Sequence, residues 1–268
     1  MSERPSRPLC LITGASSGIG AELARIFAGH GWDLALTARR ADRLEALAAQ
    51  LSAAHDCEAF AIVADLGKPG AADAILQAVA ARGRTVSGLV NNAGYGLPAR
   101  FVTSAWEDQA RMLQVMLTAV CELTHKCLPG MAERKFGRIL NVASIAGLLP
   151  GSPGQTLYAP IKGFLVSFSE TLHVELKGKG VHVTALCPGL TYTEFHDVND
   201  TRRGIETLTP KWLWQDAGPV ARSAYEALEA NRPVCVTGWP NKAMALLGRL
   251  LPDGLAMTLT AGAYAKRS

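Results

Sequence analysis

Leu9-Cys-Leu-Ile-Thr-Gly-Ala-Ser-Ser-Gly-Ile-Gly20 is an apolar run of strand length that leads into a glycine-rich turn. Leu23, Ile26 and Phe27 then recur at helical spacing, and His30-Gly31 marks where that helix is expected to end. A buried strand, a tight turn and a helix in this order form the first half of a βαβ unit.

The same alternation of strand and helix continues along the chain. Further strands are expected at about 32–37, 59–63, 86–90, 137–144, 181–186 and 234–237, with helices over about 42–54, 71–81, 105–133 and 219–230. Another helix is expected from a few residues before Tyr158 to about Lys177. Strands that alternate with helices form parallel sheets. The pattern predicts one α/β domain over residues 1–268: a Rossmann-type doubly wound parallel sheet of about seven strands, with helices on both faces. A loop-like insertion is expected at about 190–218 and an apolar tail at about 241–268.

Composition and charge narrow the class of protein. The chain of 268 residues is 49% apolar and carries a net charge of +4 without a long basic run, which argues against a nucleic-acid partner. Its six cysteines form no C-x-x-C pair and no metal-like cluster, so reduced thiols, no metal site and a cytoplasmic location are expected. The uncharged residues 139–161 are interrupted by prolines and glycines, so no transmembrane helix is predicted.

The glycine-rich turn has the chemistry of a phosphate site. Glycine lets the backbone approach a ligand closely, and the start of the following helix offers free N–H groups with a partial positive charge. A pyrophosphate is the natural occupant, near Gly14, Gly18 and Gly20. The spacing is G-x-x-x-G-x-G rather than G-x-G-x-x-G, and an ordinary strand–helix turn is the alternative interpretation.

The end of the second strand bears on the choice of cofactor. A dinucleotide site usually has an acid here for the ribose 2′-hydroxyl, but this chain has Thr37-Ala-Arg-Arg40. An arginine fork matches the oxygens of a 2′-phosphate, which favours NADP(H) over NAD(H). The alternative is that one or both arginines are solvated residues at a helix start, which fits Arg40 better than Arg39.

Tyr158-Ala-Pro-Ile-Lys162 places a phenol and an ammonium on one helix face, about 5–6 Å apart at Cβ, with Ser144 upstream. A phenol has a pKa near 10, and moving it near pH 7 takes about 4 kcal/mol, which a close cation and a charged cofactor ring would supply. The pair predicts proton transfer, although such pairs also occur by chance. Pro160 is tolerated only in a first helical turn, so the helix should begin shortly before Tyr158, with Gln155 or Thr156 near its cap.

Five motifs in this order resemble the short-chain dehydrogenases/reductases over nearly the whole chain, from Leu9 to about Thr237. They are Thr13–Gly20, Asp65-Leu66, Asn91–Gly94, Ser144 with Tyr158 and Lys162, and Pro188-Gly189. The resemblance implies that Ser144 holds the substrate oxygen, that Tyr158 is the general acid/base, and that Lys162 holds the nicotinamide ribose and lowers the tyrosine pKa. An alkoxide formed by hydride transfer needs such a donor and proton source.

The resemblance also implies a set of cofactor-binding residues. Asp65 and Leu66 would lie beside the adenine, the turn after the fourth strand would support the adenosine side, and the segment after Pro188 would face the nicotinamide carboxamide. The full set is Gly14, Ser16, Ser17, Gly18, Ile19, Gly20, Arg39, Arg40, Asp65, Leu66, Asn91, Ala93, Gly94, Tyr158, Lys162, Pro188, Gly189, Thr191 and Thr193.

One departure from the family pattern lies in the long central helix. Met116 stands where the family has an asparagine whose backbone carbonyl supports a water-linked proton relay to the lysine. The relay would survive through the backbone, with altered helix geometry. The leading hypothesis is an NADPH-dependent carbonyl reductase or alcohol dehydrogenase. The alternative, supported by Met116, is a cofactor-binding regulatory or scaffold protein with weak or no catalysis.

The side chains expected near the nicotinamide are mostly apolar, which favours a hydrophobic ketone, aldehyde or secondary alcohol; each could equally belong to the core. They are Tyr95, Leu148, Leu149, Leu190, Tyr192 and Phe195. By family analogy, residues 190–215 form a lid and the protein is a homodimer or homotetramer; His196 is a poor catalytic candidate. The tail is expected to pack against the domain or a neighbouring subunit, with peripheral membrane contact as the less favoured alternative.

Overall fold

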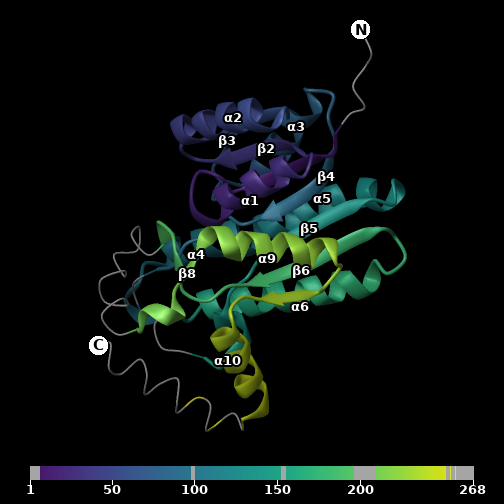
Figure 1. Cartoon of the computed structure of the whole chain (residues 1–268). Helices are drawn as coiled ribbons and strands as arrows, with labels where there is room; N and C mark the ends of the chain where they lie inside the picture. Colours follow the sequence, from purple (N-terminus) through teal and green to yellow (C-terminus); the bar gives the residue numbers. More distant parts are fainter. Residues whose placement is uncertain are drawn as a thin grey trace.

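Strand β1 (Leu9–Thr13) lies in the middle of a seven-stranded sheet in the computed structural model, which describes residues 7–97, 100–151, 155–195, 209–251, 254 and 257. All neighbouring strands are parallel, in the order β3-β2-β1-β4-β5-β6-β9 (Figure 1). The other strands are β2 (Asp33–Ala38), β3 (Ala59–Val63), β4 (Val86–Asn91), β5 (Gly137–Val142), β6 (Val181–Cys187) and β9 (Val234–Val236). The predicted doubly wound sheet is confirmed.

Helices cover both faces of the sheet, because its central strands are apolar on both sides. All five residues of β1 are buried. One face packs against α1 (Gly18–Gly29), α2 (Ala41–His55) and α9 (Ala217–Glu229), and the other against α3 (Ala71–Ala80), α5 (Ala119–Glu133) and α6 (Tyr158–Glu175). Phe27 is fully buried in the layer of α1, α2 and α9, and Met131 is fully buried in the layer of α3, α5 and α6.

The strand order reverses direction between β1 and β4, which are neighbours in the sheet. Connections from β1 run toward β2 and β3, and those from β4 run toward β5 and β6. In open parallel sheets, such a switch point leaves a crevice at the carboxyl ends of the strands, where ligands bind. The glycine-rich turn after β1 and the turn after β4 both lie at this crevice.

The helix expected over residues 105–133 is confirmed as unbroken helical backbone from Trp106 to Glu133, but it contains a π-helical turn that the sequence did not indicate. It consists of α4 (Trp106–Leu113), a π-helical turn η2 (Gln114–Thr118) and α5. The Ala119 N–H donates to Gln114 O, five residues back, so the helix is locally widened. Two consecutive residues of this turn, Val115 and Met116, are both buried in the core beneath the sheet.

The described ends of the insertion contain a short strand pair and a 3-10 turn, of which the strand pair was not expected from the sequence. β7 (Thr191–Tyr192) pairs in parallel with β8 (Gln215–Asp216), and the 3-10 turn η4 (Lys211–Leu213) precedes β8. The middle of the predicted lid, including His196, lies outside the described residues. Two further 3-10 turns, η1 (Phe101–Thr103) and η3 (Ile145–Leu148), follow β4 and β5.

The tail begins with helix α10 (Trp239–Leu250), which extends away from the sheet in Figure 1. This helix packs on η3 and leaves the side chains of Trp239, Leu246 and Leu250 exposed. Within the described residues, no helix combines the length and the apolar character needed to cross a bilayer. The packing of α10 on η3 agrees with the expected packing of the tail against the domain, and membrane contact stays the less favoured alternative.

Candidate active site

The glycine-rich turn is held against the turn that follows β4. Gly14 and Gly18 have φ values of +65° and +56°, in the left-handed region that favours glycine. A Cβ at Gly14 would lie 2.9 Å from the Ala93 Cα. The Asn92 amide donates to Thr13 O at 2.9 Å and to Gly14 O at 3.1 Å, which closes the two turns on each other.

The start of α1 is suited to an anion. Its N-cap residue, Ser17, makes no side-chain capping hydrogen bond, and the first turn contains no acidic residue. Arg40 adds a positive charge here, because its guanidinium donates to Ser16 Oγ at 2.8 Å and to Ser17 Oγ at 2.9 Å. Backbone N–H groups, a helix dipole and a guanidinium together favour a phosphate.

The alternative interpretation of the two arginines after β2, that they are solvated residues at a helix start, fits Arg39 better than Arg40, which is the reverse of the expected order. Arg40 is not a solvated helix-start residue: it binds both serines and also pairs with Glu194 at 2.8 Å. Arg39 is the exposed one, and it makes no hydrogen bond or ion pair with the described part of the chain. Arg39 is therefore open to a ligand anion, whereas Arg40 already has partners from the turn and from the segment after β7.

The loop that carries Ser144 is seated directly on α6. A Cβ at Gly147 would lie 2.4 Å from the Lys162 carbonyl carbon and 2.5 Å from the Gly163 nitrogen, so the two backbones touch. Ser144 itself caps η3, where its Oγ accepts a hydrogen bond of 3.2 Å from Ala146 N. This contact explains how residues that are far apart in the sequence are brought to the same end of the sheet.

Lys162 is a buried cation beside the Tyr158 ring. Only 4% of its surface is exposed, and its Nζ donates to Val142 O at 2.7 Å, at the end of β5. The Nζ lies 5.6 Å from the centroid of the Tyr158 ring. Burial lowers the pKa of Lys162 to about 8, because the charged form loses its hydration.

Tyr158 is the first residue of α6, with Leu157 as its N-cap rather than Gln155 or Thr156. Pro160 consequently lies in the first turn, as predicted, where no helical hydrogen bond is lost. The Tyr158 ring contacts the ring of Phe195, with 5.9 Å between their centroids. The phenol thus lies between a buried ammonium and an apolar wall.

Comparison with known proteins agrees with this geometry. A family model described as short chain dehydrogenase matches residues 9–203, which includes the glycine-rich turn and the Ser144–Tyr158–Lys162 set. The chain is a short-chain dehydrogenase.

Individual relatives show which proteins this short-chain dehydrogenase is similar to. Sulfoacetaldehyde reductase 2 of Chromohalobacter salexigens is 37% identical over 216 residues, which cover 79% of this chain and 82% of the relative. A short-chain dehydrogenase of Sphingobium yanoikuyae in complex with NADPH has a TM-score of 0.78 at 32% identity, covering 92% of this chain and 94% of that one. The bulky-bulky ketone specific alcohol dehydrogenase of Comamonas testosteroni has a TM-score of 0.75 at 27% identity, covering 92% and 93%.

The expected adenine side of this short-chain dehydrogenase contains a salt bridge that the sequence did not reveal. Asp65 accepts hydrogen bonds from Arg111 at 2.7 and 2.9 Å and from Gly67 N at 3.0 Å. Burial raises the pKa of Asp65, but these hydrogen bonds outweigh it, so the pKa lies below its ordinary value. Leu66 is buried beside it.

Two residues expected at the cofactor or substrate have side chains turned into the protein. The Asn91 amide donates to Asn141 Oδ1 at 2.8 Å and to Thr124 Oγ1 at 3.2 Å, within the core. The Tyr95 phenol is buried toward Arg111 and Asp65, and burial raises its pKa. Among the described residues, Asn91 Oδ1 and Tyr95 OH are buried without a hydrogen-bond partner. Burying such a group costs about 1–3 kcal/mol, and a hydrogen bond from a ligand or a water molecule would offset this cost.

The segment after β6 reaches the glycine-rich turn. Thr193 packs on Gly18, where an added Cβ would lie 3.0 Å from its side chain. Gly189 is covered by Asn241 of α10, only 2.3 Å from where a Cβ would stand, and the Thr191 hydroxyl donates to Gly189 O at 3.1 Å. Pro188 O accepts from Ile145 N at 2.9 Å, so this segment is tied to the Ser144 loop.

The other predicted substrate residues are divided between two places. Tyr192 stacks on Trp214, with ring centroids 4.8 Å apart, on the side of the insertion. Leu148 and Leu149 lie under α10, where the Leu149 side chain would be 3.3 Å from a Cβ at Gly248. Leu190 O accepts from Gln215 N. Phe195 of this set packs on the Tyr158 ring.

Proposed function

We propose that this short-chain dehydrogenase transfers a hydride between NADP(H) and a hydrophobic ketone or aldehyde, or the matching secondary alcohol. The observation that carries the proposal is the meeting of Tyr158, buried Lys162 and the Ser144 loop at the carboxyl end of β5, next to an anion-binding turn. Phosphate-binding and proton-transfer groups are thus combined at one end of the sheet.

The residues present fit a nicotinamide dinucleotide. The uncapped start of α1 and the turn with Gly14 and Gly18 would hold the pyrophosphate. Exposed Arg39 and the nearby Arg40 would hold a 2′-phosphate, which NADH lacks. The cofactor, when bound, supplies the hydride. The NADPH found with the Sphingobium yanoikuyae relative supports this choice.

The side chains of the chain itself would manage the proton. Tyr158 would give its phenolic proton to the oxygen that gains charge during reduction, and Ser144 would donate a hydrogen bond to the same oxygen. Lys162 is protonated below about pH 8, so near neutral pH its charge favours the phenolate that remains. A buried position makes that charge more effective than a solvated one.

The surroundings of Tyr158 favour an apolar substrate. Phe195 packs on the phenol ring, and Leu148 and Leu149 lie on the loop that begins at Ser144. The name of the Comamonas testosteroni relative points in the same direction, whereas sulfoacetaldehyde in another relative's name is a small charged aldehyde. By family resemblance, the protein is expected to form a homodimer or homotetramer.

An oxidation screen tests this function. Purified protein is mixed with NADPH, and in parallel with NADH, and offered bulky ketones, aliphatic aldehydes and sulfonated small aldehydes. The proposal expects NADPH oxidation with bulky apolar carbonyl compounds and much slower oxidation of NADH. Tight NADPH binding without turnover of any compound or of any secondary alcohol would contradict it, and turnover of sulfonated aldehydes alone would overturn the substrate class.

A further inference from the structure

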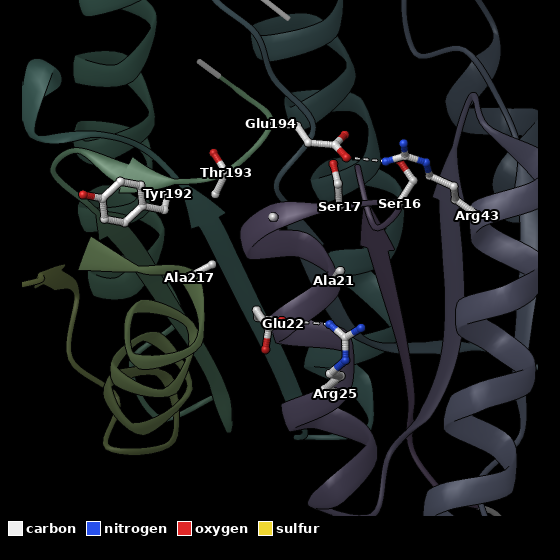
Figure 2. Close-up of a pocket in the computed structure, with 11 residues that line it drawn as sticks. Ser16, Ser17, Ala21, Glu22, Arg25, Arg43, Tyr192, Thr193, Glu194 and Ala217 are labelled. Carbon is white, nitrogen blue, oxygen red and sulfur yellow. Dashed lines mark hydrogen bonds and ion pairs between the residues drawn. The ribbon is translucent and has the colours of Figure 1, made fainter. Parts of the chain in front are cut away.

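Glu194 is held between two arginines next to the glycine-rich turn. Its carboxylate accepts a hydrogen bond of 2.8 Å from Arg40. It also pairs with Arg43, as Figure 2 shows. Hydrogen bonds from Arg40 and then from Arg43 lower the pKa of Glu194 to about 2, so this side chain is ionised at neutral pH. Neither arginine is a sequence neighbour of Glu194, so the contact joins two distant segments.

The same arginines border the expected phosphate site. Arg40 also binds Ser16 and Ser17 at the start of α1, and Arg43 lines an open depression of about 540 Å³ together with these serines (Figure 2). A guanidinium fork binds phosphate oxygens as well as it binds a carboxylate. Glu194 therefore occupies cations that a nucleotide phosphate would also seek.

Glu194 belongs to a three-residue segment, Thr193–Phe195, which we call the strap. Thr193 packs on Gly18 of the glycine-rich turn, and Phe195 packs on Tyr158. The strap therefore extends from the phosphate site to the general acid. Its middle residue, Glu194, makes the ion pairs with Arg40 and Arg43. Glu194 therefore lies between a contact with the glycine-rich turn and a contact with the general acid.

We propose that Glu194 is a specificity-determining residue that competes with the cofactor's 2′-phosphate for Arg40, which would hold this phosphate together with Arg39, and for the adjoining Arg43. A nucleotide with this phosphate displaces the Glu194 carboxylate and releases the strap, and a nucleotide without it leaves the ion pairs in place. The inference rests on the proposed function, because it requires NADP(H) as the cofactor. A 2′-phosphate carries up to two negative charges against one on the carboxylate, which allows it to win this competition.

Glu22 provides a matched control on the same depression. It lies on α1 near Gly18, and its carboxylate pairs with Arg25 at 2.8 Å instead of with Arg40 or Arg43 (Figure 2). Replacing Glu22 by Gln removes the same charge from the same surface without freeing the two arginines. Glu194 and Glu22 are both about one-third exposed, so glutamine is accommodated at either position.

Calorimetric titration of the cofactor-free protein with 2′,5′-ADP and with 5′-AMP tests the competition directly. These nucleotides differ in the 2′-phosphate and carry no nicotinamide. The Kd of Glu194→Gln for 2′,5′-ADP is expected to fall about tenfold below the wild-type value, with the Kd for 5′-AMP unchanged. Glu22→Gln is expected to match the wild-type protein with both nucleotides.

Two results would overturn the proposal, and they are distinguishable. If wild-type protein prefers 2′,5′-ADP but Glu194→Gln binds it no more tightly, Glu194 is only a structural ion-pair partner. If the wild-type protein does not distinguish the two nucleotides, NADP(H) is the wrong cofactor, and the proposed function fails together with the competition.

The fluorescence of Trp214 offers a second measurement, for which ligand-free Glu194→Gln is the reference. Trp214 is buried and stacks on Tyr192, which directly precedes the strap. Saturating 2′,5′-ADP is expected to shift the fluorescence of wild-type protein toward that of ligand-free Glu194→Gln, and 5′-AMP is not. A Trp214→Phe variant identifies the responding indole, and equal shifts with both nucleotides would contradict release by the 2′-phosphate.

Discussion

Lys162 is the residue whose environment shapes the chemistry most. Its ammonium is nearly inaccessible, is held by Val142 O and stands beside the Tyr158 ring. A lysine in water has a pKa near 10.4, so burial brings the loss of its charge close to the neutral range. The ammonium that favours the phenolate is therefore also the group whose deprotonation limits the pH range of activity.

The activity is expected to fall as pH rises past about 8, where free Lys162 loses its proton. The pH profile of kcat/KM reports the groups of the free enzyme, so the decline should appear there with NADPH and a confirmed ketone. Lys162→Arg keeps its charge at high pH, so the decline that comes from residue 162 should be absent in this variant, and any decline that remains reports the deprotonation of Tyr158. A profile that stays level to pH 10 in the wild-type protein would contradict the assignment.

The same lowered pKa has the opposite consequence for stability. Between about pH 8 and 10 the unfolded chain binds a proton at Lys162 that the folded protein has lost. The free energy of unfolding contributed by this site should therefore increase with pH across this window. Urea unfolding of the wild-type protein against Lys162→Met measures it, and parallel pH dependences for the two proteins would contradict the prediction.

At the level of elements, the close contact between η3 and α6 sets the position of Ser144. Gly147→Ala should destabilise the protein by about 1–3 kcal/mol and reduce activity, because the added methyl would meet backbone atoms of Lys162 and Gly163 that have nowhere to move. Gly151→Ala is the control, since a Cβ there has no atom within 4 Å. Denaturant unfolding and turnover of both variants check this; equal stabilities would show that the contact has room to relax.

Several elements followed from the sequence and others did not. The seven strands could be predicted, because short apolar runs that alternate with helical patterns are typical of the buried strands of a parallel sheet. The π-helical turn at Met116 could not be predicted, because the spacing of apolar residues along a helix does not show whether one turn contains an extra residue. The pairing of β7 with β8 was also missed, because two-residue strands leave no periodicity.

The candidate site shows a similar division. Tyr158, Lys162 and Ser144 were recognisable from their spacing and from the family resemblance. Partners supplied from a distance were missed: Arg111 for Asp65, and Glu194 for Arg40. A lone arginine after a strand can be solvated or paired, and only the fold brings residue 194 to residue 40.

For the whole molecule, cofactor binding should stabilise the fold as one unit. At a concentration of 100 times its Kd, NADPH adds about 2.7 kcal/mol to the free energy of unfolding. For a domain of this size, that corresponds to a rise in Tm of about 5–10 °C, in one cooperative transition. Differential scanning calorimetry checks both statements. NADH at the same concentration should raise Tm less, and two separate transitions would contradict a single domain.

The turnover of Tyr158→Phe tests the central claim most directly. The rate of NADPH oxidation with a bulky ketone identified in the screen is compared between wild-type protein and this variant, with NADPH binding measured for both. Because the variant retains the ring that packs on Phe195 but has no proton to give, its kcat should fall by about 10²–10⁴-fold with NADPH affinity preserved. Full turnover by Tyr158→Phe would show that another group supplies the proton.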